Sequence, residues 1–207
     1  MLRKTVLISA VIALVVVTGN ARGMNERGVK GPKANSINIA TQSYAGIDRT
    51  TGVCIADIPL SELTDTQKEG LVFMIEEEKM ARDVYTHLYN THELRIFANI
   101  ARAEQQHMDA LQALLDRYEL EAPLTLGEVG VFENDELQAL YDELTVKGDL
   151  SLVDALGVGV AIEEVDIADL EDMLNAGVPE DFTMIYENLL KGSYNHLNAF
   201  NRQLARQ

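Results

Sequence analysis

The feature that most constrains the fold of this chain is a helical hydrophobic period that runs from Leu60 to the C-terminus. In four long segments, apolar residues recur three and four positions apart, which places them on one face of an α-helix. No segment alternates apolar and polar residues as a half-buried strand would. The chain has 207 residues and is 47% hydrophobic, which is enough for a core of its own. The sequence therefore predicts a single all-α domain.

Capping residues indicate where these helices begin and end. Thr64 and Gln67 form the Thr-x-x-Gln pattern of a capping box, Ser151 precedes the third apolar stripe, and Pro179 precedes the fourth. We expect long helices at about 64–90, 96–118, 151–175 and 181–207.

The connections between the helices predict how they pack. The first and third connections are short, whereas Glu119–Leu150 is long and holds one short amphipathic helix, capped by Asn134 and stopped by Gly148. A simple up-and-down bundle would have three short loops. The order short, long, short predicts the ferritin-like form of four-helix bundle, with one long crossover that carries a short extra helix.

The N-terminal residues are expected to lie outside this domain. Arg3 and Lys4 precede an apolar run at 6–17 that is short for a membrane span, and small residues follow it. This pattern is typical of a secretory signal cleaved near Ala21, with an uncleaved N-terminal anchor as the alternative. The predicted organisation is a signal peptide at 1–21, a flexible tether at 22–58 and the helical domain at 59–207, in a protein exported to the periplasm or the extracellular space.

Charge and cysteine content exclude several classes of protein. The chain has 17 Lys and Arg against 33 Asp and Glu, a formal charge of -16, which disfavours nucleic acid and anionic membranes as partners. Cys54 is the only cysteine, so no intramolecular disulfide and no cysteine-rich metal cluster can form. We expect it to be a free thiol at the domain edge. A metal site in this chain would need histidines and carboxylates.

Polar residues interrupt the apolar stripe of every long helix near its middle. Glu78, for example, takes a position on the stripe of Leu71 and Met74 that packing alone would give to leucine. Because antiparallel helices of similar length bring their midpoints to one level, we expect these side chains to converge. They are Glu78 on the first helix, Glu104 and His107 on the second, Glu163 and Asp166 on the third, and His196 on the fourth.

The rotation of the third helix distinguishes its acidic residues. At about 100° per residue, with Val158 at zero, Glu163 falls near ~140° and Asp166 near ~80°, on either side of Leu170. Glu164 falls near ~240°, on the polar side. We expect Glu163 and Asp166 to be buried and Glu164 to face water.

Four carboxylates and two imidazoles in an apolar interior point to metal binding. Isolated buried charges cost several kcal/mol or more each, and two divalent cations would balance four carboxylates. Oxygen-rich ligation with one imidazole per ion suits iron, and manganese is the alternative.

Other polar residues have simpler explanations. His87 and His92 lie off the stripe or in a loop and are expected to be solvated bystanders. Glu76, Glu77 and Lys79 are interpreted as a solvated face.

Aromatic and sulfur-containing side chains on the stripes are expected in the core. Met74 and Phe97 are interpreted in this way. Tyr85 lies two turns after Glu78 on the same stripe, and core packing and a radical or ligand-supporting role both stay open for it.

Two motifs carry a resemblance to known proteins. The segment EKMARDVY, which begins at Glu78, is similar to the first-helix motif of rubrerythrin-type ferritin-like proteins, and Glu104-Gln105-Gln106-His107 matches their second-helix motif. Across about 60–204 the chain resembles the ferritin-like family called domain of unknown function 2202, through the stretches EEEKMARDVY, FANIARAEQQHMDAL, GVFENDELQALYDEL, IEEVDIADLE and YENLLKGSYNHLNAF.

The resemblance implies a carboxylate-bridged di-iron centre that reacts with dioxygen or peroxide. The chain departs from the pattern at Ser193, where a glutamate three residues before His196 is expected, and Asp166 is the candidate replacement. Glu78 and His107 would then bind one iron, and His196 with one third-helix acid the other. Glu104 and the remaining acid would bridge them.

The resulting hypothesis is an exported di-iron protein that oxidises ferrous iron or reduces peroxide or dioxygen. Because no cysteine cluster is present to supply electrons, an enzyme of this kind would need an external electron donor. The alternative is a metal-free or manganese-bound bundle that acts as a structural or stress-related binding module. Whether the protein is an enzyme, and whether it forms a homo-oligomer, stay open at this point.

Overall fold

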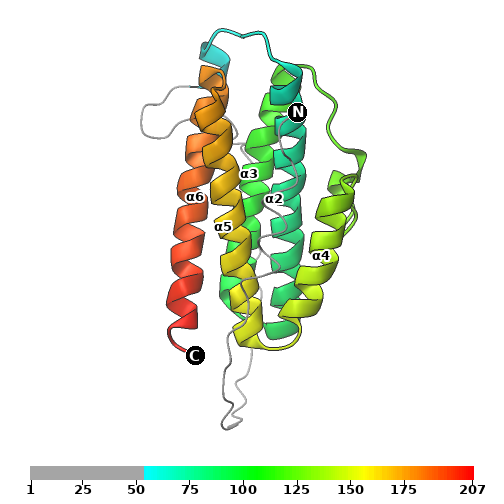
Figure 1. Cartoon of the computed structure of the whole chain (residues 1–207), viewed down its shortest axis with the longest axis vertical. Coiled ribbons are helices and arrows are strands. Elements are labelled where there is room, and N and C mark those ends of the chain that lie inside the picture. Colours follow the sequence, from blue (N-terminus) through cyan, green and yellow to red (C-terminus); the bar gives the residue numbers. More distant parts are fainter. Residues whose placement is uncertain (1–53) are drawn as a thin grey trace, which may run out of the picture.

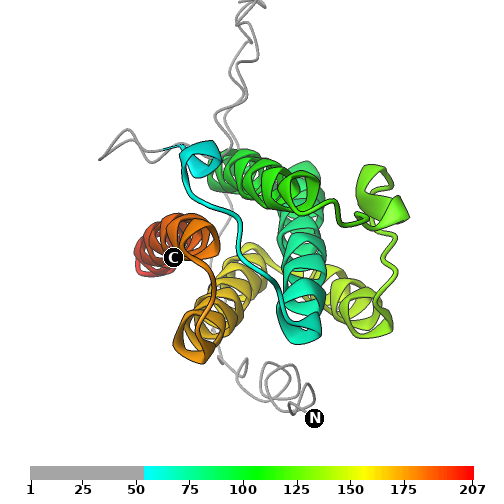
Figure 2. The same cartoon turned by 90° about the horizontal axis from the view of Figure 1, so that it is seen from above.

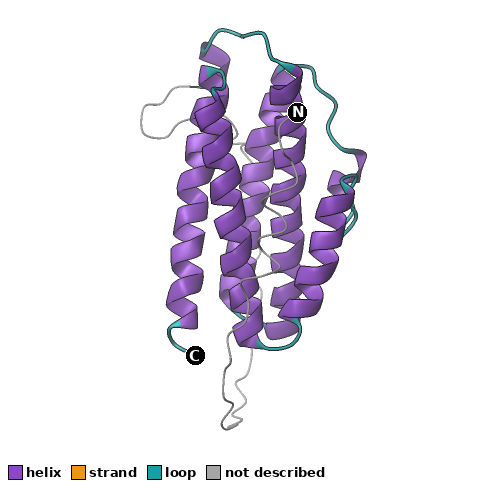
Figure 3. Cartoon of the chain, viewed as in Figure 1, coloured by secondary structure: helices purple, strands orange, loops and turns teal. Residues whose placement is uncertain are grey.

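The computed structural model describes residues 54–207, which form five α-helices and two short 3-10 helices (Figures 1 and 3). The all-α prediction is confirmed for this range, and each helix begins and ends within a few residues of its predicted boundary. The α-helices are α2 Asp65–His92, α3 Arg95–Arg117, α4 Asp135–Gly148, α5 Leu152–Ala176 and α6 Glu180–Leu204, and the 3-10 helices are η1 Ile55–Asp57 and η2 Leu124–Gly127.

The predicted caps are present at the helix starts. The Thr64 side chain accepts a hydrogen bond from the Gln67 backbone N–H at 3.2 Å, and the Gln67 side chain accepts one from the Thr64 N–H at 2.9 Å. The Asn134 and Ser151 side chains also accept hydrogen bonds from backbone N–H groups in the first turns of α4 and α5. These bonds satisfy backbone donors that the first turn of a helix leaves without partners.

The long helices pack as two pairs, α2 with α3 and α5 with α6 (Figures 1 and 2). Short loops join the helices within each pair, so the two partners run antiparallel. Residues 118–134 and α4 form the long connection between the pairs, and α4 lies against α2 and α5. The predicted order of connections is confirmed.

The apolar core is divided into two clusters along the length of the bundle. One surrounds the C-terminal half of α2 and includes Tyr85, Phe97 and Phe200. The other surrounds the N-terminal half of α2 and includes Met74 and Phe182. The predicted core positions of Met74 and Phe97 are confirmed. The polar residues that interrupt the helical stripes lie between these two clusters.

The outer face of α2 corrects one prediction, because the expected solvated residues Glu76, Glu77 and Lys79 are all buried. The crossover covers Glu76 and Lys79, whereas Glu77 lies near the acidic residues of α5. The Glu133 backbone N–H donates to Glu76 Oε1 at 2.7 Å. Lys79 Nζ donates to Asp83 Oδ2 and to a crossover carbonyl, each at 2.9 Å. The helical period identifies the face toward the partner helices but not a second face covered by the crossover.

The predicted signal peptide and nearly all of the predicted tether lie outside the described residues. The end of the tether packs on the domain instead of hanging free: Ile55 and Ile58 are buried, and Arg117 donates a hydrogen bond to the Ile58 carbonyl. The packed domain therefore begins before residue 59. Cys54 is a half-buried free thiol. Among residues 54–207, no helix has the length and apolar character needed to cross a membrane.

Candidate metal centre

One group of converging side chains comes from α2 and α3. Ligand atoms of Glu78, Glu104 and His107 all lie within 4.8 Å of one another. His107 Nδ1 is 3.2 Å from Glu78 Oε2 and 2.8 Å from Glu104 Oε2. Both glutamates are 2% exposed, and the imidazole is 12% exposed. The group could hold a metal ion.

A second group overlaps the first and draws on α5 and α6. It consists of Glu104, Glu163 and His196. His196 Nδ1 is 3.0 Å from Glu104 Oε1 and 3.5 Å from Glu163 Oε2. Glu104 therefore directs one oxygen to each histidine, and the two imidazole rings stack with centroids 5.6 Å apart. These two overlapping buried groups could each bind a metal ion.

The donor atoms fit a metal because several of them lack a hydrogen bond. Glu78 Oε1, Glu104 Oε1, Asp166 Oδ1 and His196 Nδ1 are buried without a hydrogen bond. Although His196 Nδ1 and Glu104 Oε1 are 3.0 Å apart, the pair lacks the alignment of a hydrogen bond. This is expected of two ligand atoms that point to a shared third position. Buried polar atoms without partners are costly, and a cation would satisfy them.

The carboxylates differ in their affinity for protons. Burial raises the pKa of Glu78 to about 7, and burial together with the charge of Glu104 raises the pKa of Glu163 to about 7. Burial acts on Glu104 in the same direction, but His107 and His196 outweigh it and lower the pKa of Glu104 to about 2. The carboxylate shared by both groups is therefore ionised at neutral pH.

Both imidazoles hold a proton when no metal is bound. Burial alone would lower the pKa of His107, but Glu78 and Glu104 raise it well above its ordinary value. Burial opposes protonation of His196 as well, yet its contacts with Glu104 and Glu163 raise the pKa of His196 to about 10. In the metal-free protein the two imidazolium groups thus balance carboxylate charge that bound metal ions would otherwise balance.

Asp166 lies in the same layer but outside both groups of converging atoms. It is 6% exposed, and burial and the charge of Glu78 raise its pKa, while the Ser193 hydroxyl opposes this rise. Ser193 is itself 1% exposed and occupies the position where the resemblance implies a glutamate. The predicted burial of Glu163 and Asp166 and the exposure of Glu164 are confirmed.

Tyr85 both packs in the core and contacts a candidate ligand. Its ring lies 5.3 Å from that of Phe200, and its hydroxyl donates a hydrogen bond to Glu163 Oε1 at 2.6 Å. Burial and the charge of Glu163 raise the pKa of Tyr85 well above its ordinary value. The hydroxyl therefore keeps its proton and orients Glu163.

The other two histidines lie outside this layer, as predicted, but they are not solvated bystanders. His87 Nε2 is 2.8 Å from Asp149 Oδ1, and His92 Nε2 is 2.8 Å from the Gly148 carbonyl oxygen. His92 belongs to the last turn of α2 and not to a loop. Both tie the end of α2 to the turn between α4 and α5.

Sequence reasoning missed Gly192, which makes room for His107. A Cβ atom at this position would lie 2.6 Å from His107 Nε2, closer than atoms can pack. A half-buried glycine gives no helical-period signal, so only the packing of α6 against α3 identifies its role.

We expect Gly192→Ala to weaken metal binding by about tenfold or more, because it must displace His107. Alanine has a higher helix propensity than glycine, so the substitution should not destabilise the helix of the apo domain through its propensity. Gly70→Ala is the matched control, because its Cβ would meet Met173 Cε at an ordinary 3.5 Å. Calorimetric titration with Co²⁺ measures both variants. If Gly192→Ala and Gly70→Ala bound Co²⁺ with equal affinity, His107 would not need its observed position for metal binding.

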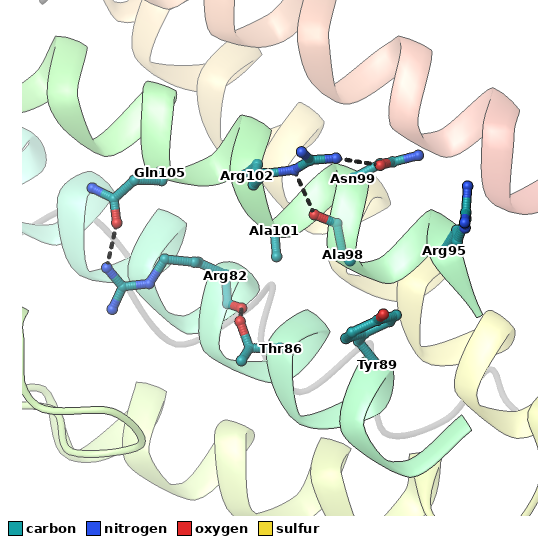
Figure 4. A pocket seen from close by; sticks show the side chains of 9 residues that line it. All are labelled: Arg82, Thr86, Tyr89, Arg95, Ala98, Asn99, Ala101, Arg102 and Gln105. Carbon is teal, nitrogen blue, oxygen red and sulfur yellow. Dashed lines mark hydrogen bonds between the residues drawn. The ribbon is translucent and has the colours of Figure 1, made fainter. Parts of the chain in front are cut away.

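A surface hollow of about 680 Å³ lies elsewhere, between α2 and α3 (Figure 4). Arg82, Arg95 and Arg102 contribute to its lining, and Arg82 donates to Gln105 at 2.7 Å across it. None of the predicted metal ligands lines this hollow. This hollow is therefore separate from the candidate centre.

Fold and site together define a helical domain with two overlapping Glu/Glu/His groups that could bind metal. The chain belongs to the family described as an uncharacterised protein domain, DUF2202, which matches residues 67–207. It is 51% identical over 150 residues to the uncharacterised protein MJ0754 of Methanocaldococcus jannaschii, covering 72% of this chain and 81% of that protein. The crystal structure of hypothetical protein MJ0754 from Methanococcus jannaschii has a TM-score of 0.70 and 50% identity, covering 72% of this chain and 85% of that chain.

Proposed function

We propose that this protein is an exported ferritin-like protein whose four long helices hold a carboxylate-bridged pair of iron ions. The observation that carries the proposal is the position of Glu104, which directs one oxygen to each Glu/Glu/His group. One carboxylate between two imidazoles suits two ions better than one. Two antiparallel pairs joined by a long crossover support the ferritin-like assignment. Manganese suits the same donors, so elemental analysis of the purified protein is needed to identify the bound metal.

The ligands divide between the two groups. Glu78 and His107 would hold one ion, Glu163 and His196 the other, and Glu104 would bridge them. Asp166, beside Ser193, would supply the remaining carboxylate that a fourth-helix glutamate provides in related proteins.

The proposed reaction is oxidation of ferrous iron, or reduction of peroxide or dioxygen with an external electron donor. A ferrous pair supplies the electrons for this chemistry. Tyr85 holds Glu163 through its hydroxyl, and apolar clusters lie on both sides of the layer. Because His107 and His196 hold protons when no metal is bound, metal uptake by this site releases protons.

The redox proposal is tested by mixing anaerobic, ferrous-loaded protein with peroxide or with oxygenated buffer. We expect ferric absorption to develop faster than for free ferrous ion in the same buffer. A His107→Ala, His196→Ala double variant is the control, since it lacks both imidazoles. Iron that binds but oxidises no faster than free ferrous ion would contradict the redox proposal and favour a structural or stress-related binding module.

The acidic residues of α5 test the proposed ligand set within one helix. Glu163→Ala and Asp166→Ala are each expected to lower iron occupancy, because both carboxyls are buried in the polar layer. Glu164→Ala should leave occupancy intact and change stability by less than about 0.5 kcal/mol, since its side chain faces water. Elemental analysis of the three loaded variants measures the difference. Loss of iron in Glu164→Ala together with retention in Glu163→Ala would exclude the proposed ligand set.

A further inference from the structure

A line of carboxylates leads from the candidate centre to the surface between α2 and α5. Asp166, Asp169 and Asp172 are spaced three residues apart on α5, so each step advances about 4.5 Å and turns about 60° around the helix. Their exposure increases along the line: Asp166 is buried, Asp169 is half-buried and Asp172 is exposed. The stripe therefore slopes from the interior to solvent.

Glu77 on α2 faces this stripe from the other side. It is 3% exposed, and its Oε2 has no hydrogen-bond partner. Its carboxyl group interacts electrostatically with Asp169 and Asp166 on α5 and with Glu78 on α2. Glu77 thus connects the half-buried part of the stripe to the candidate centre.

The carboxylates of this line differ from other buried acids because nothing in the described region neutralises them. Asp83 is paired with Lys79 and Arg82, and Glu76 accepts the Glu133 backbone N–H. Within residues 54–207, no ion pair involves any of Glu77, Asp169 and Asp172. These carboxylates are therefore available to an external cation.

We propose that Asp172, Asp169 and Glu77 form the path by which a divalent cation reaches the buried centre. This inference rests on the proposed metal-binding function. Carboxylate oxygens bind hard divalent cations, and successive acids let a cation leave water in stages instead of crossing an apolar wall. Glu77 and Asp169 form a transfer position and not a storage site, because they lack the imidazole that each Glu/Glu/His group has.

The path is tested by the kinetics of Co²⁺ uptake, followed by stopped-flow absorption, since Co²⁺ reports coordination without being oxidised by the buffer. Asp169→Asn is expected to slow uptake by about tenfold and to leave the amount bound at equilibrium unchanged. Removal of bound Co²⁺ by a chelator should slow by the same factor, because both directions use one path. Glu164→Gln is the control: it removes the same charge from an exposed position of α5.

The outcomes separate the path from the site. If the unaltered protein takes up no Co²⁺, both the metal-binding function and the path are wrong. If it takes up Co²⁺ and Asp169→Asn matches it in rate, the path alone is overturned. If Asp169→Asn and Glu164→Gln slowed Co²⁺ uptake equally, the path would also be overturned, because the loss of net surface charge alone would explain the slower uptake.

Discussion

Replacing Glu104 with glutamine is expected to weaken metal binding strongly at both Glu/Glu/His groups. Each oxygen of Glu104 approaches a different histidine, so one substitution removes a charged ligand from both positions. We expect affinity to fall by more than about hundredfold at each position, a loss at least as large as that for residues that merely support ligands. Glu78→Gln should weaken only the position next to His107, because Glu78 belongs to one group.

Calorimetric titration of Glu104→Gln, Glu78→Gln and the unaltered protein with Co²⁺ distinguishes these cases. Glutamine keeps the shape of the side chain, and melting of the apo variants controls for folding. A Glu104→Gln protein that keeps one site of full affinity would show that the two positions do not share this carboxylate.

The stability of the metal-free domain is expected to fall as pH rises from about 4.5 to about 7. Over this range the unfolded state has lost the protons of Glu78 and Glu163, whereas the folded state keeps them, because their pKa values are raised from 4.5 to about 7. A raised carboxyl pKa stabilises the folded state at low pH, and this stabilisation is lost as pH rises. The loss is on the order of 3 kcal/mol for each carboxyl.

The histidines extend this decline to higher pH. The pKa of His196 rises from 6.5 to about 10 on folding, so its contribution is complete below 6.5 and is lost through about 10. Glu104 acts in the opposite sense: its contribution is present above 4.5 and is lost as pH falls toward 2. The polar layer should therefore stabilise the apo domain most near pH 4.5.

Metal should reverse this dependence, because the ligands must lose their protons to bind it. Thermal melting with a chelator and with added metal, at a series of pH values, measures both trends. Glu163→Gln should flatten the apo decline between pH 4.5 and 7, while the exposed Glu164→Gln should not. An apo melting temperature that rises between pH 4.5 and 7 would contradict the raised pKa values of Glu78 and Glu163.

Helical periodicity was sufficient to predict the helices and most of the polar layer. Glu78 and Glu104 stand out because packing would place leucine there, and the rotation of the third helix separates Glu163 from Glu164 without any structure. These inferences work because each concerns one face of one helix. Antiparallel packing of helices of similar length then brings the midpoints of the four long helices to a common level.

The remaining features depend on contacts between elements that are distant in sequence. Glu76 and Lys79 were expected in water because the sequence of a single helix does not show what covers its second face, and here the crossover covers it. Gly192 gives no signal until α6 packs against His107. The approach of Glu77 to Asp169 depends on how α2 packs against α5. Sequence periodicity therefore predicted the buried polar layer but not its surroundings.

The central claim is that one chain binds two ions through the six side chains of the polar layer, and metal stoichiometry tests it most directly. Protein without metal is loaded anaerobically with ferrous iron, freed of excess and analysed for iron per chain. We expect about two iron ions per chain, and almost none in a His107→Ala, His196→Ala double variant. A binding isotherm of the unaltered protein that cannot be told from that of the double variant would contradict the claim.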